Sequence, residues 1–262
     1  MGLASMTEVS TLTLIARLSA FVAILQTTEL IYLRTWFASE GIWDWQTLRH
    51  DYDESPALVR AFLDRYFANF NFPFLLWFRL IVSLVVLAHP DLFGTTLLFL
   101  TAFMICVRFR GTFNGGSDSM TLLTLLAVTV GFIKPQSEFY AHLGLCMITA
   151  FVVISYTIAG LSKLKNPSWR NGEALNQLMK TSRWATIKTV PLKFALLASW
   201  TTLIFEGFFA FSLAAPIVCI GFLSAGVVFH WLNHRLLGLN RFFWAWVITY
   251  PAVLSIARHL TH

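Results

Sequence analysis

"FYAHLGLCMITAFVVISYTIAGLSK", residues 139–163, is the run that points most directly to the class of this protein. Its one Lys, Arg, Asp or Glu is Lys163, at the last position. A helix needs about 20 mostly apolar residues to cross the hydrocarbon core of a bilayer. Because the run exceeds that length, we expect residues 139–163 to form a membrane-spanning helix.

The whole chain shares this apolar character. Of its 262 residues, 57% are hydrophobic and only 12% are charged, whereas charged residues make up roughly a quarter of a soluble domain. The 25 Phe and 10 Trp residues also suit lipid and its interfaces. We therefore predict an all-α integral membrane protein, a polytopic bundle of about eight transmembrane helices that forms a single domain over residues 1–262.

Apolar runs of suitable length define the eight expected spans. They cover residues 11–33, 73–89, 91–108, 119–134, 139–163, 194–213, 216–234 and 241–258. The two runs that meet at Ala215-Pro216 could also be one kinked segment. A proline that follows a small-residue turn favours two spans, with Pro216 in the first turn of the second.

Two segments that mix polar and apolar residues are predicted to be interfacial amphipathic helices. In residues 54–70, Ser55 is the expected N-cap and Pro56 the first helical residue. The expected apolar stripe of this helix repeats every four residues, at Leu58, Phe62, Tyr66 and Phe70. In residues 171–190, Asn171 is the expected cap of a second, shorter helix.

The distribution of Lys and Arg predicts the orientation. With eight spans, fifteen of these residues fall in loops on one side and two, Lys134 and Arg258, on the other. Because basic loops stay in the cytoplasm, we predict a protein of a bacterial cytoplasmic membrane with both termini outside. The basic residues are spread over short loops, which argues against a nucleic-acid partner. The expected partners are membrane lipid and, as a further possibility, other membrane proteins.

Three charges inside the expected spans are interpreted as structural. Arg17, Arg79 and Glu206 lie within apolar runs, where an unpaired charge is costly. Glu206 has no apparent role on sequence grounds beyond pairing with Arg17 or Arg79 across the bundle. We therefore expect one of these two ion pairs.

Lys163 has two interpretations. A lysine at the end of a span can snorkel, with its ammonium in water and its stem over apolar surface. Alternatively, burial can leave a neutral amine that acts as a base. The sequence alone leaves both open.

His230 and His234 are four residues apart in "FHWLNHR" and share a helix face with Asn233 between them. This spacing can hold a metal ion, but Trp231 stands where a zinc protease carries its glutamate. Because no carboxylate pair or cysteine cluster completes a site, we predict no metal here. His230 is instead expected to be a hydrogen-bonding group that faces the bundle interior.

The segment "RGTFNGGSDSMTLL", residues 110–123, combines a glycine turn with a helix start. Two glycines allow positive backbone angles, and Ser117 or Asp118 can cap the helix that follows. The segment is either a tight turn between spans or a helix N-terminus that receives an anion. On the second interpretation, Asn114, Ser117 and Asp118 contact a ligand.

Three segments together resemble one family. Residues 156–175, "YTIAGLSKLKNPSWRNGEAL", resemble the AG-x-x-KL and W-x-x-G stretch of the vitamin K-dependent gamma-carboxylase and of its bacterial relatives, the HTTM (horizontally transferred transmembrane) proteins. Residues 229–254 resemble their FH-x-x-N segment and the aromatic span after it, and residues 110–123 resemble a loop and span start of bacterial members. The three segments occur in the family's order.

The resemblance implies a helical membrane bundle with a site for a quinone or another lipid-soluble substrate. In the carboxylase, the lysine that matches Lys163 is the proposed base toward reduced vitamin K, and the histidine that matches His230 supports it. Lys163 and His230 are therefore the expected catalytic residues. The expected substrate-binding residues are Asn114, Ser117, Asp118, Trp169 and Asn233. The cofactor is left open, with a quinone as the candidate.

Two functions follow. The first is a gamma-carboxylase-like membrane enzyme that uses Lys163. The second is a non-catalytic subunit or assembly factor of a larger membrane complex, because this chain has Gly-Gly-Ser-Asp at residues 115–118 where the carboxylase has an Asn-His pair. A transporter ranks third, since no duplicated halves or paired broken helices are evident. Whether the chain is an enzyme is left open by its sequence.

Overall fold

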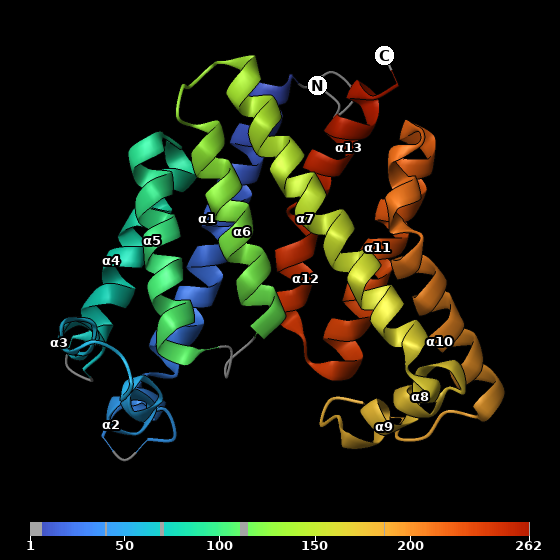
Figure 1. Ribbon diagram of the computed structural model, residues 1–262, viewed down its shortest axis with the longest axis horizontal. Coiled ribbons are helices and arrows are strands. Elements are labelled where there is room, and N and C mark those ends of the chain that lie inside the picture. The colour runs from blue at the N-terminus through green and yellow to red at the C-terminus, as the bar shows by residue number, and fades with distance from the viewer. Residues whose placement is uncertain (1–6, 40, 69–70, 111–114, 186, 262) are drawn as a thin grey trace. The chain divides into compact units, whose positions relative to one another are not determined.

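The computed structural model describes residues 7–39, 41–68, 71–110, 115–185 and 187–261. All regular elements in these ranges are helices, which confirms the all-α prediction (Figure 1). The longer helices are α1 (Glu8–Tyr32), α4 (Phe72–Ala88), α5 (Leu92–Phe109), α6 (Gly115–Gly131), α7 (Glu138–Lys165), α10 (Leu192–Gly207) and α11 (Pro216–Leu237). The shorter ones are η2 (Arg34–Phe37), α2 (Trp45–Leu48), η3 (Arg49–Tyr52), α3 (Ala57–Phe67), α8 (Pro167–Arg170), α9 (Glu173–Thr181), η4 (Phe209–Leu213), α12 (Asn240–Val247) and α13 (Tyr250–His259).

The chain forms two compact units. The N-terminal unit comprises Ala16–Pro135, and the C-terminal unit comprises Met1–Ile15 together with Gln136–His262. Helix α1 therefore contributes its first turns to the C-terminal unit and the rest to the N-terminal unit. A single domain over the whole chain stays a prediction.

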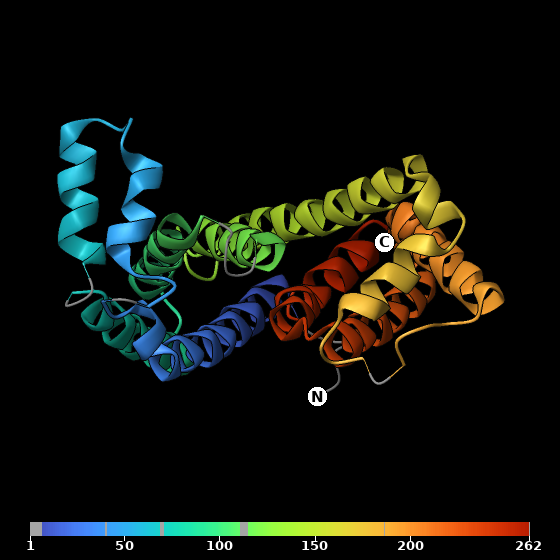
Figure 2. The same cartoon turned by 90° about the horizontal axis from the view of Figure 1, so that it is seen from below.

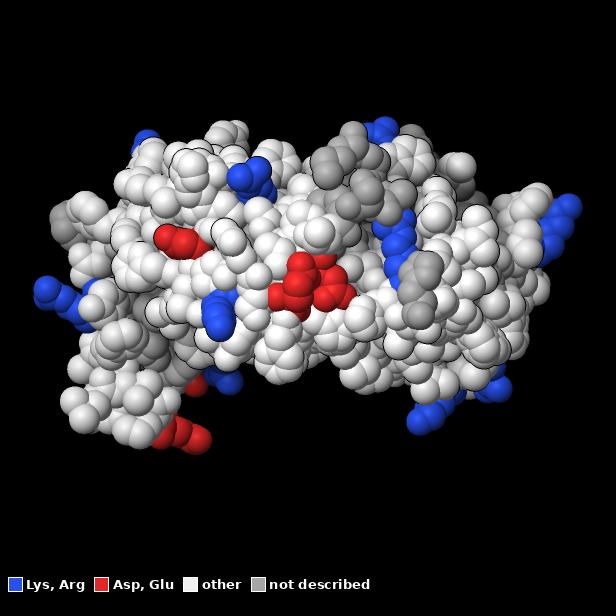
Figure 3. Space-filling model, turned by 90° about the horizontal axis from the view of Figure 1, so that it is seen from above, with Lys and Arg blue, Asp and Glu red and all other residues white. Residues whose placement is uncertain are grey.

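Four helices in the described residues are long and apolar enough to cross a membrane, namely α1, α5, α7 and α11. The number rises to five if α3 and α4 are one broken span. Helix α6 is apolar but shorter. Most atoms visible in the space-filling view belong to residues other than Lys, Arg, Asp and Glu (Figure 3). These features are compatible with a membrane protein, and the count of eight spans stays a prediction.

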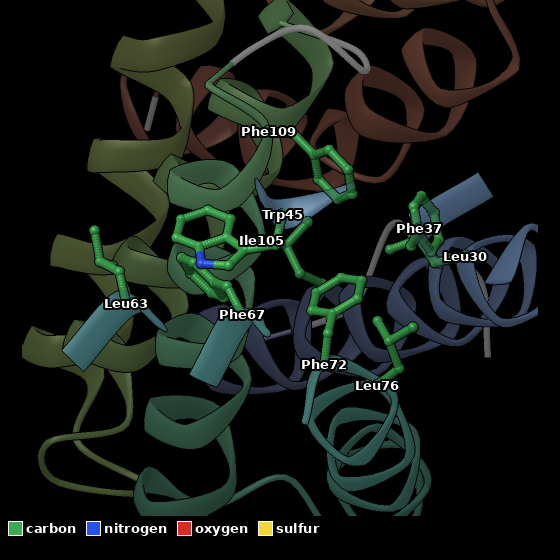
Figure 4. Close-up of a cluster of buried hydrophobic side chains, with 9 residues drawn as sticks. All are labelled: Leu30, Phe37, Trp45, Leu63, Phe67, Phe72, Leu76, Ile105 and Phe109. Atoms are coloured by element: carbon green, nitrogen blue, oxygen red, sulfur yellow. The ribbon is translucent and has the colours of Figure 1, made fainter. Parts of the chain in front are cut away.

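The core of the N-terminal unit is a cluster of buried, largely aromatic side chains (Figure 4). Its members come from α1, η2, α2, α3, α4 and α5: Leu30, Phe37, Trp45, Leu63, Phe67, Phe72, Leu76, Ile105 and Phe109. The rings of Phe37 and Phe72 meet edge to face with centroids 5.6 Å apart, an arrangement favoured by the ring quadrupoles. This cluster fixes the short helices before α3 to the long helices of the unit.

A buried arginine lies within this aromatic core. The Arg108 guanidinium donates hydrogen bonds to the carbonyl oxygens of Phe67 at 2.8 Å and Trp43 at 3.1 Å. It also lies 4.3 Å from the centroid of the Phe72 ring, within the range of a cation–π interaction. Arg108 thus satisfies the carbonyl group of Trp43, shortly before α2, and that of Phe67, the last residue of α3.

Helix α3 differs from its predicted form. It begins at Ala57, so that Pro56 and not Ser55 is the cap residue, and Pro56 makes no side-chain cap hydrogen bond. The segment Trp45–Tyr52 lies alongside α3 (Figure 2), and the Trp45 indole and the Arg49 guanidinium each donate to the Asp64 carboxylate at 2.8 Å. The buried residues of α3 are consequently Leu63 and Phe67.

The predicted apolar stripe of α3 is exposed. The exposed fractions are 87% for Leu58, 49% for Phe62 and 47% for Tyr66, while Phe70 lies outside the described residues. The predicted helix is confirmed, and the face that packs on the protein carries Leu63 and Phe67 instead of this stripe. An exposed apolar stripe is what a helix lying on a membrane surface presents, so the interfacial position of α3 stays a prediction. The N-cap residue of α9 is Gly172 and not Asn171, although the Asn171 side chain does accept from the backbone N–H of Glu173, the first residue of α9, at 3.0 Å.

Two other predicted helix ends were wrong. The eighth expected span, 241–258, consists of two helices, α12 and α13, that meet at Ile248 and Thr249. Pro251 lies in the first turn of α13 and has no backbone N–H to continue the hydrogen bonding of α12. Helix α6 begins at Gly115, so Ser117 and Asp118 lie in its first turn, after the N-cap position. The acidic side chain of Asp118 in the first turn still interacts favourably with the helix dipole.

The two arginines predicted to be structural each have a hydrogen-bond partner, and their role stays a prediction. Arg79 is buried and donates to the Thr27 hydroxyl and the Gln26 side-chain oxygen, each at 3.1 Å. Arg17 donates to the carbonyl oxygen of Ala88 at 3.4 Å. Both arginines and all these partners belong to the N-terminal unit.

Replacing Arg108 by leucine is expected to destabilise the protein. Two carbonyl groups would lose charge-assisted hydrogen bonds worth about 1.5 kcal/mol each, so the free energy of unfolding should fall by about 3 kcal/mol. Denaturant unfolding in detergent micelles measures this change. Arg60→Leu, at an exposed position of α3, is the control and should have little effect. Equal losses in the two variants would contradict the role given to Arg108.

Candidate functional site

Three residues of α7 form a stripe along one side of the helix. Tyr156, Gly160 and Lys163 are spaced by four and three residues, which places them on one helix face. Tyr156 and Gly160 are buried, and Lys163 lies in the last turn. This stripe faces α10 and η4, which lie alongside α7 in the C-terminal unit (Figure 1).

The absence of a side chain at Gly160 lets α10 approach α7 closely. A Cβ atom built at Gly160 would lie 2.4 Å from the backbone nitrogen of Gly207, closer than atoms in a protein can pack. A Cβ atom built at Gly207 would meet nothing within 4 Å. The close approach therefore depends on Gly160 and not on Gly207. It brings Glu206 and the residues of η4 against the α7 stripe.

Lys163 forms an ion pair across this contact. Its Nζ atom lies 2.5 Å from Oε2 of Glu206, and the exposed fractions of the two side chains are 22% and 5%. The predicted pairing of Glu206 with Arg17 or Arg79 was therefore wrong. Lys163 is therefore held by a buried carboxylate at the end of α10, and both interpretations of Lys163, an anchor and a base, stay open.

Trp169 connects the ion pair to an open pocket. The Lys163 ammonium lies 5.3 Å from the centroid of the Trp169 ring, within range of a cation–π interaction. Trp169 also lines a pocket of about 360 Å³ between α8 and α9. The other lining residues are Asn166, Ser168, Ala174, Gln177, Leu178 and Thr181. The predicted site residues Lys163 and Trp169 thus lie together, and Trp169 lines a pocket of mixed polarity.

A chain of buried hydrogen-bonding groups lies two turns away along the stripe. The Tyr156 hydroxyl is 2.6 Å from Nε2 of His230 and 2.7 Å from the Tyr250 hydroxyl. His230 is 2% exposed and faces the interior of its unit, which agrees with its predicted orientation. Gly226 makes room for this chain, because a Cβ atom there would lie 2.3 Å from the Tyr250 hydroxyl.

Aromatic rings enclose these polar groups. Phe209 stacks on Tyr156 with ring centroids 4.1 Å apart, and Trp246 stacks on His230 at 5.3 Å. The Nδ1 atom of His230 is buried and has no hydrogen-bond partner among the described residues. Several other buried side-chain atoms of the described residues also lack a partner, so this atom leaves His230 free to bond a ligand or water without singling it out.

The arrangement places several groups that exchange protons along one helix face. The ion pair offers an amine and a carboxylate in contact. The second cluster offers two phenols and an imidazole in hydrogen-bond contact. Such groups are those that carry out general acid–base chemistry. The site can therefore accept a proton at the pocket end of α7, with a second polar cluster two turns deeper.

The other predicted site residues are placed as follows. Asn233 lies on α11 three residues after His230 and is partly buried. Ser117 and Asp118 belong to the N-terminal unit, whereas Lys163 and His230 belong to the C-terminal unit. Asn114 lies outside the described residues. Their predicted contacts with a ligand stay predictions.

Two residues of the site were missed from the sequence. Tyr156 lies four residues before Gly160 and seven before Lys163, a helical spacing that could have revealed it. Tyr250 lies next to Pro251 in the aromatic segment after His230. No periodic signal relates Tyr250 to Tyr156, because the two residues are 94 positions apart and on different helices.

Comparison of the chain with models of protein families, with characterised proteins and with solved structures finds no match. The resemblance to HTTM proteins and the gamma-carboxylase therefore stays a prediction.

Gly160→Ala is expected to weaken the contact between α7 and α10. The new methyl group would collide with the backbone of Gly207, which has no flexible end to move. Overpacking of this kind costs about 1–3 kcal/mol, measured as the change in free energy of unfolding in detergent. Gly207→Ala is the matched control on the opposite side of the same contact and should be tolerated. Similar losses in both variants would contradict the close approach.

Tyr156→Phe tests the buried hydrogen-bonded chain. The change keeps the ring on Phe209 but removes the hydroxyl between His230 and Tyr250, leaving buried polar atoms unpaired. Such a loss costs about 1–3 kcal/mol, and chemical unfolding measures it. Tyr140→Phe serves as the control, because it keeps the ring that contacts Phe139. If the variant unfolds at the same free energy as the parent protein, the hydrogen bonds of Tyr156 do not stabilise the fold.

Proposed function

We propose that this chain is a polytopic integral membrane protein of the HTTM type. The proposal comprises eight transmembrane spans, basic loops in the cytoplasm and both termini outside. Its support is the apolar composition, the four helices of spanning length and the fifteen-to-two distribution of basic residues. The three family-like segments include Lys163, Trp169 and His230, of which the first two lie in contact and the third lies on the same unit.

The proposed activity is that of an enzyme that removes a proton from a lipid-soluble substrate. The observation that carries it is the Lys163–Glu206 pair, whose ammonium lies 5.3 Å from the ring centroid of Trp169, a residue that lines a pocket. Replacing a buried ion pair by apolar residues is often neutral or stabilising. The pair is therefore not needed for stability, whereas a role in proton transfer would explain why it is present.

The proposed step moves one proton, in net terms, from the substrate to the Lys163–Glu206 pair. The Lys163 ammonium passes a proton to Glu206 and becomes a neutral amine, and this amine takes a proton from a hydroxyl group of the substrate. The substrate is left as an oxyanion, and the pair has gained one proton as an ammonium and a carboxylic acid. The substrate class is a phenol or hydroquinone, whose hydroxyl is acidic enough for an amine to deprotonate.

The surroundings of the pair suit such a substrate. Trp169 and Leu178 provide apolar surface in the pocket, and Asn166, Gln177 and Thr181 provide hydrogen-bonding groups. Ligand pockets typically combine an apolar lining with a few polar groups that set orientation. The hydrogen-bonded cluster of Tyr156, His230 and Tyr250 would support the site from further along α7. His230 is the residue predicted to assist the base.

Mass spectrometry of the protein purified in a gentle detergent tests this function. We expect a quinone-type lipid in about equimolar amount with the parent protein and a loss of most of it in Lys163→Ala and His230→Ala. Lys165→Ala is the matched control, because Lys165 ends the same helix but is exposed. It should retain the lipid.

Lys163→Arg distinguishes a base from a mere positive charge. Arginine keeps the charge and can pair with Glu206, but its guanidinium does not deprotonate in proteins. The variant should therefore retain the bound lipid but no longer convert it to product. A stable set of partner proteins with no small molecule, unaffected by any change at Lys163, would instead favour the non-catalytic subunit of a membrane complex.

A further inference from the structure

Three ionisable side chains meet at the end of α7 that is opposite Lys163. Glu8 is the first residue of α1, His142 lies in the second turn of α7, and His259 is the last residue of α13. All three belong to the C-terminal unit. In Figure 1 the start of α1, the start of α7 and the end of α13 lie near one another.

The geometry of the cluster is close to that of a metal site. Oε1 of Glu8 lies 2.8 Å from Nδ1 of His142 and 3.4 Å from Nδ1 of His259. The candidate ligand atoms of all three residues lie within 4.8 Å of one another. Zinc binds nitrogen and carboxylate oxygen at about 2.1 Å, so neighbouring ligand atoms of a tetrahedral ion lie about 3.4 Å apart. Small side-chain rotations would bring the three atoms to that spacing.

We propose that Glu8, His142 and His259 form a binding site for a divalent transition-metal ion, with Zn²⁺ as the best fit. Two imidazoles and one carboxylate are the ligand set of several zinc enzymes and suit other borderline metals as well. Each ligand comes from a different helix, so the ion would join the ends of α1, α7 and α13.

A second contact positions one of the ligands. The Nε2 atom of His142 lies 3.3 Å from Sγ of Cys146, one turn along α7, while Nδ1 faces Glu8. A metal-binding histidine commonly uses its other ring nitrogen for such an outer contact, which holds the ring in the binding orientation. The contact assigns Nε2 to Cys146 and leaves Nδ1 for the metal.

The site is open on one side. The His259 side chain is 59% exposed, while Glu8 and His142 are more buried at 18% and 34%. Water can therefore reach the ion and occupy the coordination position that the three side chains leave. The site does not rest on the proposed function, since His142 and Lys163 are 21 residues apart on one helix, which is about 30 Å at 1.5 Å per residue.

Titration of the full-length, tag-free protein with Co²⁺ in detergent tests the proposal. We expect one Co²⁺ per chain, with visible absorption bands that Zn²⁺ abolishes by displacement. His259→Ala is the main variant, because an exposed residue at the end of a helix can be changed without unfolding the protein. It should weaken binding at least tenfold, and His142→Ala should do the same.

His50→Ala is the matched control. His50 also contacts a carboxylate, with Nδ1 3.0 Å from Oδ2 of Asp53, but it is not part of the three-residue cluster. This variant should bind Co²⁺ as the parent protein does.

Thermal unfolding gives a second readout. Zn²⁺ should raise the melting temperature of the parent protein, because a ligand that binds the folded state stabilises it, and should not raise that of His259→Ala. If the parent protein neither binds Co²⁺ nor melts at a higher temperature with Zn²⁺, the proposal is overturned. The three side chains would then only hold the helix ends together by hydrogen bonds. Equal weakening by His50→Ala and His259→Ala would also overturn it.

Discussion

The close approach of α7 and α10 at Gly160 is the constraint on which the candidate site depends. Packed helix axes usually lie 8–10 Å apart, at a distance set by the side chains between them. With no side chain at Gly160, the backbone of Gly207 fits directly against α7. Glu206 then reaches Lys163 one turn further along α7, and Phe209 reaches Tyr156 one turn back. One small residue thus aligns a charged contact and an aromatic contact on a single helix face.

The sequence predicted the helices well where the signal was local. The length of an apolar run and the polar residues that end it lie within the run itself, so the expected positions of α1, α4, α5, α7 and α11 agree with the structure to within a few residues. The prediction was wrong where packing between elements decided the outcome. Glu206 was expected to pair with Arg17 or Arg79, but it pairs with Lys163 on a neighbouring helix, which its own apolar run cannot reveal.

The candidate site was predictable in part for the same reason. Lys163 and Trp169 are six positions apart in the chain, and their contact lies within the reach of local reasoning. Glu206 is 43 positions from Lys163 and His230 is 74 from Tyr156. These pairs depend on which helices are neighbours, and that order is set by small residues such as Gly160 and Gly226. The sequence showed the charges inside apolar runs without showing their partners.

The two polar clusters at the ends of α7 differ in a way that follows from their surroundings. Between them lie residues 147–155, which carry no charged side chain, and Tyr156 with its buried hydrogen bonds to His230 and Tyr250. At one end, Lys163 and Glu206 contact through an amine and a carboxylate, a pair whose proton can move. At the other, Glu8 and His142 contact through a carboxylate and an imidazole beside a second imidazole, a set that favours a cation. Both clusters lie at helix ends, where water, ions and polar parts of lipids can reach a protein in a membrane. Chemistry at either end therefore needs no polar path through the centre of α7, and each cluster can act without the other.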